Sequence, residues 1–174
     1  ITAQTNTKTY DGNTSASAIP TYAGLQAGDT VTDLIEAYTN KNAGTEKTLV
    51  VTGFSVNDGN SGNNYNVTTA SDETGVINKA PLTITAQTNT KTYDGNTSAS
   101  AIPTYAGLQA GDTVTDLIEA YTNKNAGTEK TLVVTGFSVN DGNSGNNYNV
   151  TTASDETGVI NKAPLTITAQ TNTK

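Results

Sequence analysis

The chain has 174 residues, with 16 acidic side chains against nine basic ones and a formal net charge of −7. It contains no His, Cys, Met or Trp, and every basic residue is a lysine. This composition excludes disulfide scaffolds, Cys/His zinc sites, haem ligation and nucleophiles built on Cys or His. Because the isolated lysines form no basic stripe, we expect no nucleic-acid partner.

The sequence repeats itself with a period of 83 residues. The string ITAQTNTK begins at Ile1, Ile84 and Ile167, and residues 1–91 are identical to residues 84–174. A fixed period of this kind indicates tandem copies of one structural unit.

We expect the first repeat at residues 1–79 and the second at residues 80–162, with residues 163–174 as the opening strand of a third repeat.

Each period opens with a strand signal and a turn signal. Residues 82–86 alternate apolar and polar side chains, which predicts a half-buried strand with Leu82 and Ile84 facing the core. Tyr93 then precedes Asp94 and Gly95, and Asp-Gly is a strong turn signal.

The next segment allows two interpretations. Four apolar residues have the i, i+3, i+4, i+7 spacing of a helix: Val114, Leu117, Ile118 and Tyr121. Thr113 and Asp116 have the spacing of a capping box. The same residues also form an extended run, so residues 31–38 and their equivalents are either helix or strand.

Residues 131–139 are the most apolar segment and predict a strand, with Val133, Phe137 and Val139 on the core face. Short strands separated by turns predict an all-β fold. We expect two tandem elongated β-sandwich-like repeat domains of 83 residues, or β-grasp-like domains with one short helix. The tyrosines supply the bulk of the core, which in the first repeat means Tyr10, Tyr22, Tyr38 and Tyr65.

The connection between the repeats is short. Residues 78–81 separate Ile77 from Leu82, and Pro81 restricts both its own φ and the conformation of Ala80. We therefore expect a stiff joint, with successive repeats stacked end to end.

Six strings occur in a fixed order: KTYDGNT at 8–14, AGD at 27–29, KNAGT at 41–45, VTGF at 51–54, GNNY at 62–65 and INKAPLT at 77–83. Together they resemble the YDG-type repeat, related to MBG-type repeats, of large bacterial surface adhesins. The resemblance covers nearly the whole period, although residues 33–37 depart from it. It implies an extracellular stalk module on the bacterial cell surface, without enzymatic activity and without catalytic residues.

The loop rich in Asn, Asp and Gly is the one candidate metal site. Asp58 and Asn60, with their equivalents Asp141 and Asn143, offer the oxygen ligands that Ca²⁺ prefers. Each loop has a single carboxylate and no closing Glu, so a plain turn is the favoured interpretation and Ca²⁺ the alternative. No other cofactor is expected.

These observations favour a structural spacer that projects a distal adhesive region. Its partners are then the neighbouring repeats of the same chain, and no apolar run is long enough for membrane insertion. The alternative is a repeated binding module for a host glycan or glycoprotein, a host-surface ligand that tandem copies hold by avidity.

Overall fold

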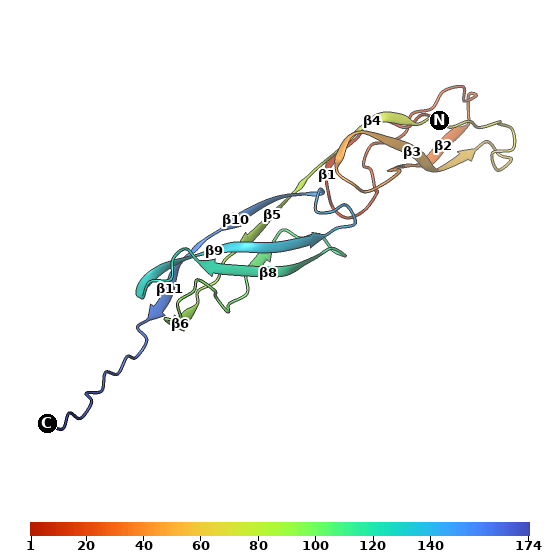
Figure 1. Ribbon diagram of the computed structural model, residues 1–174. Helices are drawn as coiled ribbons and strands as arrows, with labels where there is room; N and C mark the ends of the chain where they lie inside the picture. The colour runs from red at the N-terminus through yellow and green to blue at the C-terminus, as the bar shows by residue number, and fades with distance from the viewer. The chain divides into compact units, whose positions relative to one another are not determined.

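The computed structural model describes residues 1–174 and consists of strands and loops without any helix (Figure 1). The strands are β1 (Thr7–Thr9), β2 (Thr30–Tyr38), β3 (Gly44–Asn57), β4 (Asp72–Asn78), β5 (Ala80–Thr85), β6 (Thr90–Thr92), β7 (Thr104–Ala106), β8 (Thr113–Tyr121), β9 (Gly127–Asn140), β10 (Tyr148–Ala153) and β11 (Asp155–Asn161). The predicted all-β class is confirmed. No helix is present that has the length and apolar character needed to cross a membrane.

The strands form three sheets. One four-stranded sheet has the order β1-β4-β3-β2, and its equivalent in the second repeat has the order β6-β11-β9-β8. The pairs β1–β4 and β6–β11 are parallel. The long strands β3 and β9 run antiparallel to β4 and β11. A three-stranded sheet, β10-β5-β7, completes the second repeat.

The chain divides into two compact units whose limits differ from those of the sequence repeats. Unit 1 contains Ile1–Leu82 together with Gly107–Thr113 and Val139–Asn149. Unit 2 contains Thr83–Ala106, Val114–Ser138 and Val150–Lys174. Two loops of the second repeat therefore belong to the same compact unit as the first repeat.

The segment that allowed a helix is a strand with a bulge. Asp33 in β2 has a φ of 55°, and the pairing with β3 shifts register between Thr32 and Ile35. A bulge inserts one extra residue and changes which side chains face inward. After the bulge, Leu34 and Tyr38 lie on the same side of the strand. The bulge interrupts the alternation of apolar and polar residues, and this interruption produces the spacing that resembles a helix. The helix interpretation is wrong.

The core of each unit is small and closely packed. In unit 1, Tyr38, Leu49 and Ile77 are almost fully buried. A Cβ at Gly75 would lie 2.7 Å from the Lys47 carbonyl oxygen and 2.8 to 2.9 Å from the nearest atoms of Leu49 and Tyr38. Only glycine allows the strands this close an approach.

In unit 2 the equivalent core contains Tyr121, Leu132 and Ile160, which corrects the predicted core face of β9. Leu132 is fully buried, whereas Phe137 is 39% exposed. The continuous apolar run from Leu132 to Val134 shows no alternation, so its phase is set by packing against neighbouring strands and not by the local pattern.

β5 has the predicted alternation, with Leu82 and Ile84 fully buried. Its residues 83–85 pair with residues 104–106 of β7. In the first repeat, the residues equivalent to β7 and β10 form only isolated bridges, Thr2 with Thr21 and Thr2 with Ala70. Identical sequences are thus strands in one repeat and loops in the other, because only the second repeat has a complete β5 to pair with.

Residues 163–174, predicted as an opening strand, form no strand here and are exposed. In the second repeat the same sequence is ordered by β7 and β10, which both follow it in the chain. Equivalent partners for residues 163–174 would come after Lys174, so the strand assignment stays a prediction.

Candidate functional site

A cluster of polar groups, most of them buried, lies in unit 1, where two loops of the second repeat contact the first repeat. We call it the boundary lock, and it consists of Tyr10, Lys41, Asp112, Asn147 and Tyr148. A chain turn, with Asp112 N–H donating to Gln109 carbonyl oxygen at 3.2 Å, presents the Asp112 carboxylate. Tyr10 extends the β1–β4 ladder, since its N–H donates to the Asn78 carbonyl oxygen at 2.8 Å.

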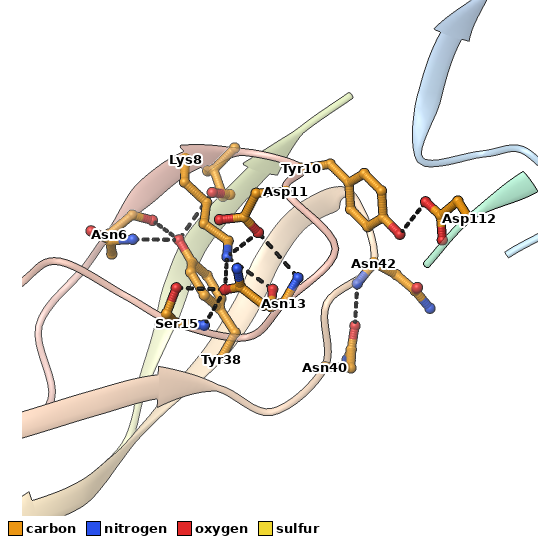
Figure 2. Close-up of polar contacts among 11 residues, drawn as sticks. Asn6, Lys8, Tyr10, Asp11, Asn13, Ser15, Tyr38, Asn40, Asn42 and Asp112 are labelled. Atoms are coloured by element: carbon orange, nitrogen blue, oxygen red, sulfur yellow. Dashed lines mark hydrogen bonds and ion pairs between the residues drawn. The ribbon is translucent and has the colours of Figure 1, made fainter. Parts of the chain in front are cut away.

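Asp112 is the centre of the boundary lock. Its Oδ2 accepts hydrogen bonds from the hydroxyls of Tyr10, at 2.9 Å, and Tyr148, at 2.6 Å (Figure 2 shows the Tyr10 bond). The two rings meet edge to face, with centroids 5.4 Å apart. All three side chains are buried. One carboxylate thus connects the two loops of the second repeat to the first repeat.

Lys41 supplies the positive charge. Its Nζ lies 3.6 Å from Asp112 Oδ1 and 5.6 Å from the centre of the Tyr10 ring, so it makes both an ion pair and a cation–π contact. Interaction with the Tyr10 hydroxyl raises the pKa of Lys41, and the Asp112 charge adds to this effect. Burial raises the pKa of Tyr10 and of Tyr148, and their hydrogen bonds to Asp112 raise both further.

Asn147 makes the second connection. Its Oδ1 accepts a hydrogen bond from Ala43 N–H at 2.9 Å, and its carbonyl oxygen accepts one from Ala80 N–H, also at 2.9 Å. Asn147 is fully buried, so these bonds satisfy groups that would otherwise be costly to remove from water. A hydrogen bond therefore joins Ala80, in the connection that contains Pro81, to the loop that contains Asn147.

The predicted metal candidates hold the loops in shape. Asp141 accepts hydrogen bonds from the backbone N–H groups of Asn143, Gly145 and Asn147 at 2.7 to 3.0 Å. Burial acts to raise the pKa of Asp141, but these three donors lower it overall. The Asn143 side-chain amide donates to Asn147 Oδ1 at 3.0 Å, which fixes the lock residue directly.

The equivalent loop of the first repeat has the same arrangement. Asp58 accepts from the N–H groups of Asn60, Gly62 and Asn64 at 2.8 to 3.1 Å, and the pKa of Asp58 is lowered, first by the Gly62 N–H. Asn60 directs its amide nitrogen towards Asn64 Oδ1. Nowhere in the chain do three acidic side chains gather as a cation site.

The string Tyr10-Asp11-Gly12 has a separate role for each residue. Tyr10 reaches Asp112, while Asp11 pairs with Lys8 at 2.7 Å and so fixes the loop (Figure 2). Gly12 has a φ of 82°, and a Cβ there would lie 3.3 Å from the Ala110 carbonyl oxygen. Glycine thus permits both the turn and the close approach of a lock loop.

Four tyrosines of the first repeat were predicted to supply the bulk of the core. Tyr10 and Tyr38 are buried as predicted, Tyr65 is half-buried, and Tyr22 is 46% exposed and is not part of the core. The roles of Asp112 and Asn147 were missed, because nothing in the local sequence indicates that a polar turn residue is buried by another repeat. The short string Ala110-Gly111-Asp112 was the only available signal.

Two buried glutamates, Glu36 and Glu119, lie in equivalent strands of the two four-stranded sheets. Glu36 is 1% exposed, and its Oε2 accepts a hydrogen bond from Gln4 N–H at 2.7 Å, while Oε1 has no partner. Burial raises the pKa of Glu36. Glu119 in unit 2 has the same surroundings, with Gln87 N–H as its donor and a pKa raised by burial.

Comparison with known proteins identifies one family. The sequence model of the YDG domain matches residues 1–73 and again residues 78–156. No curated protein and no solved structure matches the chain. The chain belongs to the YDG domain family, and it carries two YDG domains in tandem.

Proposed function

We propose that these YDG domains are spacer modules in the stalk of a bacterial cell-surface adhesin, which hold a distal adhesive region away from the envelope. The observation that carries the proposal is the boundary lock. A flexible linker would leave successive domains free to reorient, whereas here loops of the second repeat are buried against the first through Asp112 and Asn147.

The chemistry of the lock suits a spacer. Its contacts come from residues that every repeat carries, so each added repeat brings both halves of a new lock. Domains that meet through buried hydrogen bonds and an ion pair resist bending more than domains joined by a Gly/Ser linker. The acidic surface, with a net charge of −7, discourages nonspecific association.

The test is a length series measured by small-angle X-ray scattering, using chains of two, three and four repeats that all begin at Ile1. A spacer with ordered joints gains a constant increment in maximum dimension for each repeat. A flexible array instead grows roughly as the square root of repeat number. That second result would overturn the proposal.

The matched control is an Asp112→Asn chain of two repeats, compared with an Asp29→Asn chain. Asp29 is the equivalent residue of the first repeat, where it accepts a hydrogen bond from Tyr65 of its own repeat at 2.5 Å. We expect the first variant to have a broader distribution of dimensions than the parent and the second to match the parent.

A further inference from the structure

In each repeat, a strand from the beginning of the sequence lies beside the last strand, and the two run parallel. In the second repeat these strands are β6 and β11. A backbone hydrogen bond closes the pair at each end. The Val159 N–H donates to the Asn89 carbonyl oxygen at 2.9 Å, and the Tyr93 N–H donates to the Asn161 carbonyl oxygen at 2.8 Å. We call β6, β11 and these two flanking bonds the terminal clamp.

The chain ahead of β6 extends the same pairing, because β5 lies beside β10. The Ala80 N–H donates to the Asn147 carbonyl oxygen, and the Ala86 N–H donates to the Ala153 carbonyl oxygen. Both partners thus advance by the same number of residues in the same direction, so this pair is parallel as well. The entry segment of the repeat therefore follows its exit segment through two successive parallel pairs.

This arrangement determines how the repeat responds to tension. The chain enters the second repeat at the start of β5 and leaves it at the end of β11. In a parallel pair, these two points lie at opposite ends of the ladder. A pull between them draws the strands past each other, so that all the hydrogen bonds of the ladder carry the load together. Strands pulled apart from the same end would instead lose their bonds one at a time.

A buried tyrosine reinforces the terminal clamp. The Tyr121 hydroxyl oxygen lies 2.5 Å from the Asn89 carbonyl oxygen and 3.1 Å from the Val159 carbonyl oxygen. It also accepts a hydrogen bond from the Asn89 side-chain amide at 3.0 Å. Both Tyr121 and Asn89 are buried, so water does not reach these bonds to replace them when the strands begin to slide. Tyr38 and Asn6 make the same contact in unit 1 (Figure 2).

We propose that the terminal clamp bears tensile load, so that each YDG domain resists unfolding when it is pulled between its entry and exit points. Unfolding under force is governed by the rate at which the native contacts break, and a ladder loaded along its length breaks slowly. This function goes beyond the spacer role, which requires only ordered joints between domains. A chain with flexible joints can still contain the clamp, so the scattering series and a pulling experiment fail independently.

The experiment compares two directions of pulling in optical tweezers. The chain contains no cysteine, so introduced cysteines define where the DNA handles attach. Lys79→Cys with Lys162→Cys places the handles just before β5 and just after β11, which loads the clamp in shear. Thr97→Cys with Lys162→Cys places both handles beyond the same end of the clamp, which peels β6 from β11. All three positions are exposed and none lies in the clamp.

We expect the shear pair to unfold at about twice the force of the peeling pair, or more, at the same loading rate. This comparison requires no change within the clamp, so it does not depend on whether a clamp variant folds. Equal forces in the two directions, or a lower force in shear, would overturn the proposal.

The buried hydroxyl is tested by Tyr121→Phe, with circular dichroism to confirm the fold. In shear, the variant should unfold about 10- to 100-fold faster at a fixed force, because a buried hydroxyl with several hydrogen-bond partners is lost. The effect should be smaller in peeling, which starts at the other end of the clamp. Tyr105→Phe is the control and should match the parent, because Tyr105 is exposed. An unchanged rate in shear, or an equal effect in both directions, would contradict the role given to Tyr121.

Discussion

Tyr10 and Tyr93 occupy the same position in two identical repeats, yet Tyr10 is 1% exposed and Tyr93 is 39% exposed. The difference comes from the neighbouring repeat, which brings Asp112 to the Tyr10 hydroxyl at 2.9 Å. The bond between Tyr148 and Asp112 is kept in the equivalent pair, Tyr65 and Asp29, whereas the contacts with Tyr10 have no equivalent there, so Asp29 provides a control for substitutions at Asp112.

The first prediction concerns the stability of the boundary lock. Asp112→Asn should lower the free energy of unfolding by about 1–3 kcal/mol, because it removes the charge that accepts from two buried tyrosine hydroxyls. Asp29→Asn should cost less, since Asp29 is partly exposed and bonds to a single tyrosine. Urea unfolding followed by tyrosine fluorescence checks both variants, and equal costs would mean that Asp112 stabilises only its own loop.

The second prediction concerns alkaline pH. The pKa values of Tyr10 and Tyr148 are raised in the fold, so their contribution to stability is complete below the ordinary tyrosine pKa of about 10 and is lost as pH rises through the folded values. Phenolate absorbance should therefore show a late-titrating fraction. Tyr10→Phe and Tyr148→Phe should each reduce this fraction, and Asp112→Asn should move it to lower pH by removing a nearby negative charge.

The third prediction concerns acidic pH and the two buried glutamates. Burial raises the folded pKa of Glu36 and Glu119, so their effect on stability is most favourable below the unfolded glutamate pKa and weakens as pH rises through the folded value. Replacing both with Gln should raise stability at neutral pH by about 1 kcal/mol per site and flatten this part of the pH profile. Thermal unfolding from pH 4 to pH 8 checks the slope.

The lowered pKa values of Asp58 and Asp141 act in the opposite direction. Their contributions are present above the unfolded aspartate pKa and are lost as pH falls through the folded values. A double Gln variant at Glu36 and Glu119 should therefore still lose stability in strong acid. A variant whose profile keeps the parent's slope above pH 4 would contradict the assignment to the two glutamates.

The fourth prediction concerns close packing. Gly75→Ala should destabilise unit 1 by about 1–3 kcal/mol, because the new Cβ would lie 2.7 Å from the Lys47 carbonyl oxygen and force the strands apart. Gly53→Ala is the control, since its Cβ would meet its nearest neighbours at an ordinary 3.5 Å. Chemical denaturation of the two variants should separate them clearly, and equal effects would show that strand glycines matter only through backbone freedom.

Many of the strands could be predicted because they follow from local alternation of apolar and polar residues between turn signals. Leu82 and Ile84 alternate with polar residues and face the core as expected. The apolar spacing around Leu34 suggested a helix because a bulge at Asp33 interrupts the alternation, and a bulge has no reliable sequence signal. The prediction of which β9 side chains face the core was wrong for a related reason, because a continuous apolar run around Leu132 does not show which face is buried.

The lock could not be predicted from one period alone. Asp112 and Asn147 lie in turns, where polar side chains are usually exposed, and their burial depends on contacts with residues about 100 positions earlier. Identical strings also have different structures, as at Tyr65 and Tyr148, where only the second begins a strand. The strand that begins at Tyr148 pairs with β5 of its own repeat, whereas the first repeat contains only the last residues of the equivalent strand.

Because both halves of the lock are present in every 83-residue period, the gene can lose or gain whole periods by recombination without creating an unmatched joint. Each shortened or lengthened chain meets the same tyrosine and the same aspartate wherever two repeats are newly brought together. The number of repeats can then change while the contacts between neighbouring repeats stay the same. A single substitution in one copy, by contrast, damages one joint at most and spreads only when that copy is itself multiplied.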